Sequence, residues 1–394
     1  MLLQVLITIG ASQALALAIL ILLKRQPAQA DYLLSIKLFL VFLITLLYNY
    51  HDELEVVAPA LPLNSFVLGY LVLPVFYLYI KSASGREVNI FEGKHLAHLL
   101  PFLWANFILI FFFYPLPYEE KQLLFDQMLW NEKPLWFSLL YHMLFLGMFP
   151  FYLMKCFVFL KKYEDDILTK FSYTEDISLE WLSRFLWGMV IVGATFILFE
   201  VVAANFFNFS SKEGMLLPFI TLLGLVFYLG IYGLRHKIIF FDEPEPVLEN
   251  RQLPTSSDAK YQYSNLTSEK GEEYLAQLLQ FMKTEKPYLQ PKISIGELSE
   301  KADIPVHYLS QIINEKLNQN FFDFINSYRV EEFKQLLAMP DNQNYTLLSL
   351  AFEAGFNSKS SFNAIFKKIT GLTPSGFARR NSAQQALHTI SDSK

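Results

Sequence analysis

The chain has 394 residues, of which 53% are hydrophobic and only 18% are charged, and its formal net charge is −5. Phenylalanine (38 residues) and tyrosine (21 residues) are over-represented, which excludes an average soluble enzyme and favours a large lipid-facing surface. The single cysteine, Cys156, excludes an intrachain disulfide. Apolar runs fill the chain as far as Ile239, whereas the residues after Phe241 are charged and polar, so we expect two regions of different kind.

Seven apolar segments follow one another in the first region, and most are 18 residues or longer. A helix needs roughly 20 residues to cross the hydrocarbon core of a bilayer. A buried helix of a soluble protein would carry a polar stripe at helical spacing, and these segments mostly lack one. We therefore predict an all-α bundle of seven transmembrane helices within residues 1–239. The expected ranges are Leu2–Leu23, Tyr32–Tyr50, Leu63–Ile80, Leu96–Tyr114, Leu135–Leu160, Phe185–Phe207 and Met215–Leu234.

The basic residues of the predicted loops give the chain an orientation. Lys24 and Arg25 follow the first apolar segment and do not precede it, which indicates a retained anchor with its N-terminus outside, not a cleaved signal peptide. Most of the other loop lysines and arginines fall on the same side of a seven-pass topology, and acidic residues such as Glu119 and Glu120 lie on the other. This bias predicts that the chain after the seventh helix lies in the cytoplasm.

A predicted linker, residues 240–267, follows the bundle; it contains the run Asp-Glu-Pro-Glu-Pro and lacks apolar periodicity. Periodicity returns at Ser268 and predicts a soluble all-α domain over residues 268–381, with a tail over 382–394. Within that domain a short helix, a tight turn and a second helix occur twice, over 295–317 and 347–370. This is a tandem helix-turn-helix arrangement.

Local signals support the two motifs. Ser294 and Glu297 form a capping box at the start of the first motif, and Ser358 is an expected N-cap in the second. Gly355 lies where the second turn needs a positive φ, whereas the first turn has Asp303 at that place. The expected joining helix over 321–339 would be about 28 Å long, close to the roughly 34 Å repeat of the DNA major groove. Two reading helices on one face of DNA are therefore expected.

The stretch from Ala351 to Ser375, AFEAGFNSKSSFNAIFKKITGLTPS, resembles the signature of the AraC/XylS family of bacterial transcription regulators. The matching elements are the A-x3-G-F turn, the S-x-S-x-F-x3-F-K run and the closing G-x-T-P-S. The resemblance extends upstream through Tyr308–Asn314 and Phe321–Arg329 and covers residues 268–381. The whole layout is similar to a Bacteroidota subgroup of the family in which a multi-pass membrane region replaces the soluble ligand-binding domain.

The resemblance implies sequence-specific binding of double-stranded DNA, with base-reading residues on the N-terminal half of each second helix. By position these residues are Val306, His307, Ser310 and Gln311 in the first motif and Lys359, Ser360 and Asn363 in the second. Asn, Gln and Lys side chains hydrogen-bond the edges of adenine or guanine. Phosphate contacts are expected from Lys367, Lys368, Thr373, Arg379 and Arg380. Val306 and the preceding Pro305 depart from the polar residues usual there, so weaker reading by the first motif is expected.

Other residues of the domain are expected to be structural. Phe356, Phe362 and Phe366 are expected in the core, and Arg329 is expected to form internal hydrogen bonds and not to contact DNA.

Polar residues at membrane depth are candidates for sensing. Glu200 lies inside the predicted sixth span, where an ionised carboxylate costs roughly 2.5–3.5 kcal/mol. His142 and Asn106 lie at comparable depth. These three residues form either a ligand or proton site or buried hydrogen bonds that hold the bundle together, and the sequence leaves both readings open. His95 and His98 have no acid or cysteine beside them, so no metal site is expected, and no cofactor is expected either.

Together these features predict a membrane-anchored one-component transcription regulator in the bacterial inner membrane, with its DNA-binding domain in the cytoplasm. The expected partners are double-stranded DNA, membrane lipid, an unidentified small-molecule or envelope signal and, in a homodimer, a second copy. An alternative is a transporter or channel with a DNA-tethering or regulatory tail, and a third is a membrane half that only localises the regulator. An enzyme is not expected, because the sequence has no H-E-x-x-H, G-x-S-x-G or phosphate-cradling glycine loop.

Overall fold

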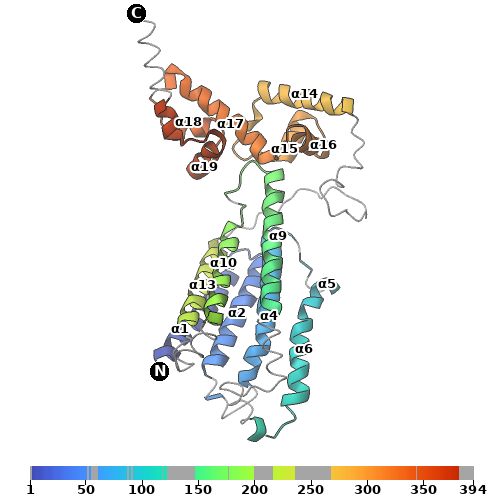
Figure 1. The fold of residues 1–394 in the computed structure, drawn as a ribbon, viewed down its shortest axis with the longest axis vertical. Helices are drawn as coiled ribbons and strands as arrows, with labels where there is room; N and C mark the ends of the chain where they lie inside the picture. The colour runs from blue at the N-terminus through green and yellow to red at the C-terminus, as the bar shows by residue number, and fades with distance from the viewer. Residues whose placement is uncertain are drawn as a thin grey trace, which may run out of the picture. The chain divides into compact units, whose positions relative to one another are not determined.

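In a computed structural model of the chain, every regular element of the described residues is a helix (Figure 1). The structure describes residues 2–50, 53–54, 61–86, 88–89, 92–117, 119–121, 147–175, 177–198, 216–235, 268–342 and 344–380. The predicted linker 240–267 and the tail 382–394 lie outside the described residues. The chain divides into two compact units, one of residues 1–163 with 179–241 and one of residues 164–178 with 242–394.

The first unit contains a helix in each of the predicted apolar segments. The first three are α1 (Leu2–Leu22), α2 (Gln29–Asn49) and α4 (Leu61–Ala83). The fourth segment is covered by a helical run of α5 (Gly93–Leu96), η1 (Ala97–Leu99), α6 (Leu100–Ile108) and the π-helical η2 (Leu109–Phe113). The last three are α9 (Phe149–Lys170), α10 (Glu180–Leu198) and α13 (Leu216–Arg235). Residues 135–146 and 199–207, where the fifth and sixth segments were expected to extend, lie outside the described residues.

Small residues set the packing of these helices. Helix α1 packs against α2 and α13, and α10 also packs against α13. A Cβ added to Gly10 of α1 would lie 2.0 Å from a Leu223 methyl carbon of α13. In the opposite direction, a Cβ on Gly230 of α13 would lie 2.4 Å from a Leu17 methyl carbon of α1. The glycines therefore let these two helices approach closely, as small residues do between membrane helices.

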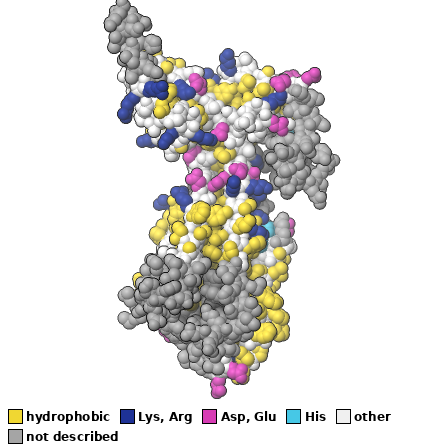
Figure 2. Space-filling view, viewed as in Figure 1, with side chains coloured by type: hydrophobic (Ala, Val, Ile, Leu, Met, Phe, Trp, Pro, Cys, Tyr) yellow, Lys and Arg dark blue, Asp and Glu magenta, His cyan; other side chains and the backbone are white. Residues whose placement is uncertain are grey.

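The first unit exposes many large apolar side chains on its outward faces. Helix α1 buries Ile7, Ala11 and Ala14, yet its Ile9 and Ile19 are 59% and 48% exposed. Figure 2 shows hydrophobic side chains gathered over the visible face of this unit. Two helical stretches of the described residues, Gln4–Leu22 and Gln29–Asn49, are long and apolar enough to cross a membrane by themselves, and three shorter apolar helices accompany them. This number falls short of the seven expected spans.

The second unit contains the helices of the predicted soluble domain. These are α14 (Ser268–Thr284), α15 (Ile295–Ala302), α16 (Val306–Gln311) with the π-helical η7 (Ile312–Lys316), α17 (Phe321–Ala338), α18 (Leu347–Glu353) and α19 (Lys359–Thr370). Short 3-10 turns, η6 (Pro287–Leu289) and η8 (Pro340–Asn342), lie between them. The expected bounds 295–317, 321–339 and 347–370 differ from the observed ones by at most one residue.

Helix α17 joins two hydrophobic cores. Phe321, Phe324 and Ile325 pack into the core around α15 and α16. Val330 and Phe333, further along the same helix, pack into the core around α18 and α19. The expected core positions Phe356, Phe362 and Phe366 belong to that second core and are at most 2% exposed. Each helix-turn-helix motif therefore has its own core on a shared helix, and α17, with 18 residues, is about 27 Å long.

Candidate nucleic-acid interface

The first helix-turn-helix motif consists of α15, a tight turn and α16 with η7. Ser294 accepts a hydrogen bond from the amide of Glu297, whose carboxylate accepts one from the amide of Ser294 at 2.7 Å, so the expected capping box is formed. Helix α15 ends at Asp303, which has a φ of 53° in the left-handed region. Ser299 then ties the turn by donating to the carbonyl of Ile304 at 2.6 Å. The turn has the backbone conformation that the sequence predicted.

The predicted base-reading residues of the first motif differ in accessibility. Val306 and His307 are exposed at the start of α16. Ser310 and Gln311 are half-buried, and both take part in contacts along their own helix. Asn314 donates to the backbone carbonyl of Ser310 at 2.8 Å, and the Gln311 amide donates to Glu315 at 3.0 Å. Of the four side chains, Val306 and His307 are therefore the exposed ones, and neither can form the paired hydrogen bonds that an amide forms with adenine.

The second motif consists of α18, a turn at Gly355 and α19. Gly355 has a φ of 93°, and a Cβ there would lie 2.3 Å from the carbonyl oxygen of Tyr288. Only glycine fits this position, because the turn needs positive φ and has no space for a side chain. Ser358 begins α19 as its N-cap and accepts from the amide of Ser361 at 3.1 Å. Gly371, with a φ of 75°, ends the helix.

The predicted base-reading residues of the second motif share one accessible face. Lys359, Ser360 and Asn363 are all exposed in the first turns of α19. The opposite face of the helix carries Phe362 and Phe366 into the core. The second motif therefore presents a lysine and an amide outward from a fixed helix, a better arrangement for hydrogen-bonding base edges than that of the first motif.

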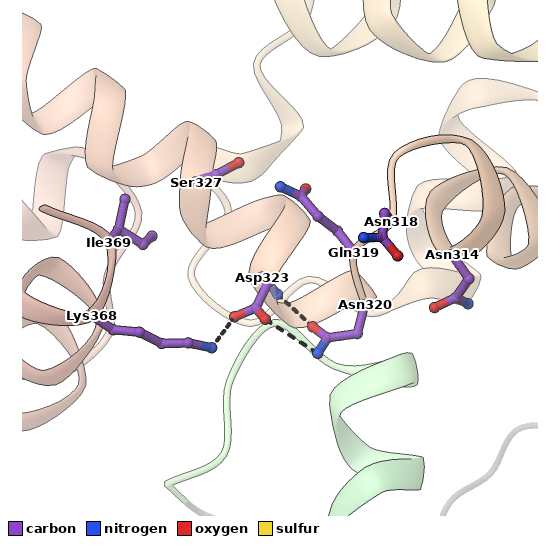
Figure 3. Close-up of a pocket in the computed structure, with 8 residues that line it drawn as sticks. All are labelled: Asn314, Asn318, Gln319, Asn320, Asp323, Ser327, Lys368 and Ile369. Carbon is purple, nitrogen blue, oxygen red and sulfur yellow. Dashed lines mark hydrogen bonds and ion pairs between the residues drawn. The ribbon is translucent and has the colours of Figure 1, made fainter.

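The predicted phosphate-contacting residues are also on the surface. Lys367, Thr373, Arg379 and Arg380 are exposed. Lys368 is exposed too, but its ammonium group forms an ion pair with Asp323 at 2.7 Å. Figure 3 shows this pair in an open pocket of about 440 Å³, lined by residues that follow the first motif, by α17 and by the end of α19. The ammonium group of Lys368 is therefore already paired with a carboxylate of α17.

Buried polar contacts lie on α17 between the two motifs. Arg329 is 1% exposed, and its guanidinium donates to the carbonyls of Tyr288, Gln290 and Pro291 and to Ser172 at 2.8–3.2 Å. Burial lowers the pKa of Arg329 to about 10, and the charge of Glu175 opposes that shift, so the group stays protonated at neutral pH. Arg329 is thus an internal hydrogen-bonding residue, as predicted.

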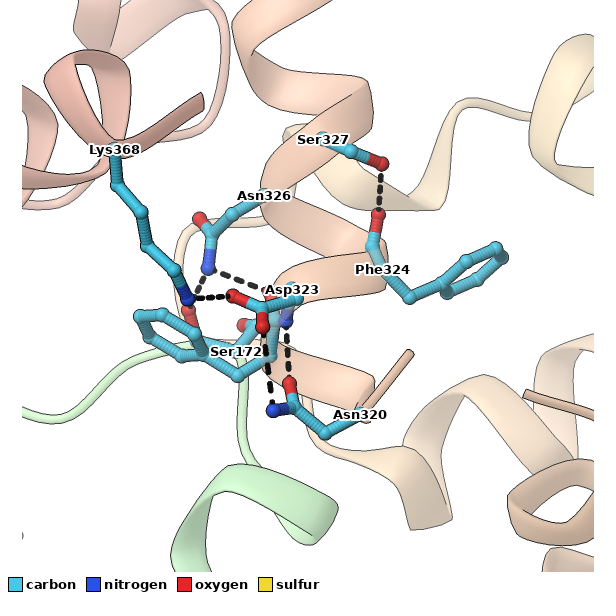
Figure 4. A network of polar contacts seen from close by, with 8 residues as sticks. Ser172, Asn320, Asp323, Phe324, Asn326, Ser327 and Lys368 are labelled. Carbon is cyan, nitrogen blue, oxygen red and sulfur yellow. Dashed lines mark hydrogen bonds and ion pairs between the residues drawn. The ribbon is translucent and has the colours of Figure 1, made fainter. Parts of the chain in front are cut away.

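A segment distant in sequence completes these contacts, and sequence reasoning missed it. Ser172, between α9 and α10, is 1% exposed and accepts at its carbonyl oxygen from Asn326 and Arg329, both at 3.1 Å. Figure 4 shows Asn326 of α17 pointing to Ser172. Three residues on, Glu175 accepts from Ser358, the N-cap of α19, at 2.9 Å. No local pattern marks either residue, because their partners lie more than 100 positions away in the chain.

In the first unit, one of the three candidate sensing residues is described. The Asn106 amide donates to the carbonyl of Phe102 in its own helix at 2.8 Å. Glu200 and His142 lie outside the described residues. A polar residue that the sequence analysis passed over, Lys37 of α2, is 4% exposed, and its ammonium lies 3.4 Å from the ring centroid of Phe76. The contact places the Lys37 side chain against an aromatic ring inside the helix bundle.

Comparison with known proteins agrees with this geometry. Residues 298–380 match the family model described as a helix-turn-helix domain. The match spans most of both motifs and the joining helix, so the expected AraC-type helix-turn-helix domain is confirmed for this region.

Two curated relatives are similar over parts of the chain. The melibiose operon regulatory protein of Escherichia coli (strain K12) is 26% identical over 158 residues, which is 40% of this chain and 47% of that protein. An uncharacterised HTH-type transcriptional regulator of Staphylococcus aureus (strain COL) is 32% identical over 105 residues, which is 25% of this chain and 14% of that protein. The chain therefore spans less than half the length of either relative. Comparison with solved structures gave no match.

Proposed function

We propose that the chain is a membrane-anchored transcription regulator that binds double-stranded DNA through two helix-turn-helix motifs. The observation that carries the proposal is the accessible face of α19, where Lys359, Ser360 and Asn363 project from a helix fixed by its own core. The exposed Lys367, Arg379 and Arg380 supply positive charge for the DNA backbone beside it. Helix α17, about 27 Å long, carries the two motif cores on different parts of its length, which allows the motifs to reach successive major grooves.

The names of the relatives support a regulatory role. One is a regulatory protein of the melibiose operon and the other is an HTH-type transcriptional regulator. The similarity covers only 47% of the first relative and 14% of the second, so the signal of either relative does not transfer to this chain.

The outward apolar surface of the first unit supports anchoring. Soluble proteins rarely expose large contiguous apolar patches. Here α6 and η2 alone expose Leu100, Trp104 and Phe111 by 50% or more. A bilayer is the solvent in which this surface is stable. We further propose that this half senses a small-molecule or envelope signal, with Glu200, His142 and Asn106 as the candidate polar residues.

The test uses the full chain. Cells expressing it are fractionated, and protein solubilised from the membrane fraction selects fragments of genomic DNA at a fixed, near-physiological salt concentration. The expected result is a motif with two half-sites about one helical turn apart. The double variant Lys359→Ala/Asn363→Ala should lose the preference at one half-site, at a cost of about 1–3 kcal/mol per base contact.

The matched control is Lys283→Ala, which removes an exposed lysine of α14 outside both motifs. It should leave the selected motif unchanged. Recovery of the wild-type chain in the soluble fraction would contradict anchoring. If the selected DNA fragments share no sequence motif, the proposed function as a transcription regulator is contradicted, and the chain only tethers DNA.

A further inference from the structure

Residues 164–178, which are the last turns of α9 and the segment that leads to α10, belong to the same compact unit as the helix-turn-helix region. The segment pairs with the strand-like residues before α15. Phe171 and Ser294 form an antiparallel bridge, and the Ser172 amide donates to the carbonyl of Ile293 at 3.2 Å. The Ser172 hydroxyl donates to the same carbonyl at 2.8 Å. The segment is thereby fixed to the start of the first motif.

The same segment is fixed to α17 and to the second core. Asn326 and Arg329 of α17 both donate to the carbonyl oxygen of Ser172. Leu168 packs against the core around α18 and α19. Beside these contacts, the ammonium of Lys292 lies 5.4 Å from the ring centroid of Tyr173. Residues 168–175 therefore contact both motifs and the helix that joins them.

Glu175 connects the segment to the start of α19, the helix that carries the predicted base-reading residues. Its carboxylate accepts from the Ser358 hydroxyl at 2.9 Å and from the Asn357 amide at 3.4 Å. Burial by itself would raise the pKa of Glu175. Hydrogen bonds from backbone amides and from the hydroxyls of Ser361 and Ser358 outweigh burial and hold that pKa below its ordinary value. The residue is therefore an anion at neutral pH.

This anion occupies the position where DNA is expected. The N-terminus of α19 carries the positive end of the helix dipole and the predicted readers Lys359 and Ser360. In helix-turn-helix proteins the N-terminal residues of the second helix contact base edges in the major groove, between two phosphate backbones. A fixed carboxylate there repels phosphate and takes the hydroxyl and amide donors that phosphate would otherwise accept from.

We propose that residues 171–175 are a built-in inhibitory ligand of the helix-turn-helix region, with Glu175 excluding DNA phosphate from the N-terminus of α19. The proposal rests on the DNA-binding function proposed above. Because α9 and α10 continue this segment on both sides, a change in those two helices reaches the DNA-binding residues through the chain itself and without the 240–267 linker.

The test compares full chains in the same detergent. Duplex DNA carrying the motif selected by the wild type is titrated against wild type, Glu175→Gln and Asp165→Asn. The second variant is the matched control, because it also removes one negative charge, from an exposed residue of α9. Glu175→Gln should bind DNA at least about 5-fold more tightly than wild type, the lower end of ordinary allosteric coupling. Asp165→Asn should bind like wild type.

A second readout does not depend on any variant. Hydrogen exchange of the peptide that contains Ser172 is measured in the wild-type chain with and without saturating DNA. DNA should speed exchange at the Ser172 amide, because its bond to Ile293 is released.

The inhibitory role is overturned if Glu175→Gln binds DNA no more tightly than wild type, or if DNA leaves the exchange at Ser172 unchanged. Neither result contradicts the proposed DNA-binding function. If the wild-type chain binds no DNA at all, the proposed function itself fails.

Discussion

At the scale of single residues, Arg329 supports the centre of the C-terminal unit. It is the largest fully buried side chain there, and its guanidinium donates to four backbone carbonyl oxygens, to Ser172 Oγ and to the side-chain oxygen of Asn326. These acceptors come from η6, from the loop after it and from the segment around Ser172. One side chain therefore satisfies polar groups of chain segments that have no regular hydrogen-bonding partner.

Replacing Arg329 by Met keeps much of the volume but removes all of these donors. Several buried carbonyls would then lack a partner, at a cost of about 1–3 kcal/mol each. We expect the variant to lose at least about 3 kcal/mol of stability in this unit. All five tryptophans precede residue 188, so tryptophan fluorescence does not report on α17 and its surroundings. Hydrogen exchange of α17 in the full chain measures the loss.

The matched control is Lys334→Met, which removes a half-exposed cation of the same helix that pairs with Glu331 at 3.1 Å. A surface ion pair is worth about 0–1 kcal/mol. Similar exchange rates in both variants would show that the contacts of Arg329 contribute little.

At the scale of elements, the two glycines of the second motif are required for different physical reasons. Gly355 and Gly371 both have positive φ, at 93° and 75°. A Cβ at Gly355 would meet the backbone of Tyr288 and Leu289 at 2.3–3.1 Å, whereas a Cβ at Gly371 would meet nothing within 4 Å. At Gly355 a larger residue would meet both an unfavourable φ and a steric clash. At Gly371 it would meet only the unfavourable φ.

We expect Gly371→Ala to cost about 1–2 kcal/mol, the ordinary penalty for an L-residue in the left-handed region. Gly355→Ala should cost clearly more, because backbone atoms of η6 must also move. Hydrogen exchange of α18 and α19 in the full chain compares the two variants. Equal losses would mean that η6 yields easily, which would contradict the close packing of the turn.

Elements of this unit could be predicted because their signals are local. Ser294 with Glu297, and Ser358 before α19, cap helices within a few residues of themselves, and the phenylalanines of α19 repeat at helical spacing. The contacts of Ser172 and Glu175 could not be predicted, because the pairing of Ser172 with Ile293 and the hydrogen bond from Ser358 to Glu175 depend on the tertiary fold. The pairing of Lys368 with Asp323 was missed for the same reason.

At the scale of the whole molecule, the boundary between the two units does not follow the order of the chain. Residues 164–178, from the last turns of α9 to the segment before α10, group with the helix-turn-helix region, although the apolar parts of both helices belong to the other unit. A fragment that begins after the 240–267 linker leaves Arg329 and Asn326 without the carbonyl of Ser172 and leaves the second core without Leu168.

We therefore expect the fragment 264–394 to be less stable than the same fragment with residues 164–178 fused through a flexible linker to its N-terminus. The fusion restores at least two buried hydrogen bonds, each worth about 1 kcal/mol, and the burial of Phe171 and Leu168. For a domain of this size that gain raises Tm by about 5 °C or more. Thermal unfolding followed by circular dichroism measures both fragments.

A fusion that carries Ser172→Pro is the control, because proline removes the amide that donates to Ile293 and fixes φ at a value unsuited to extended pairing. It should melt like the fragment without the segment. If all three melt at the same temperature, the segment only lies against the domain and contributes nothing to its stability. If only the native fusion is stabilised, the C-terminal helix-turn-helix unit is incomplete without residues 164–178, which lie before the linker in the chain.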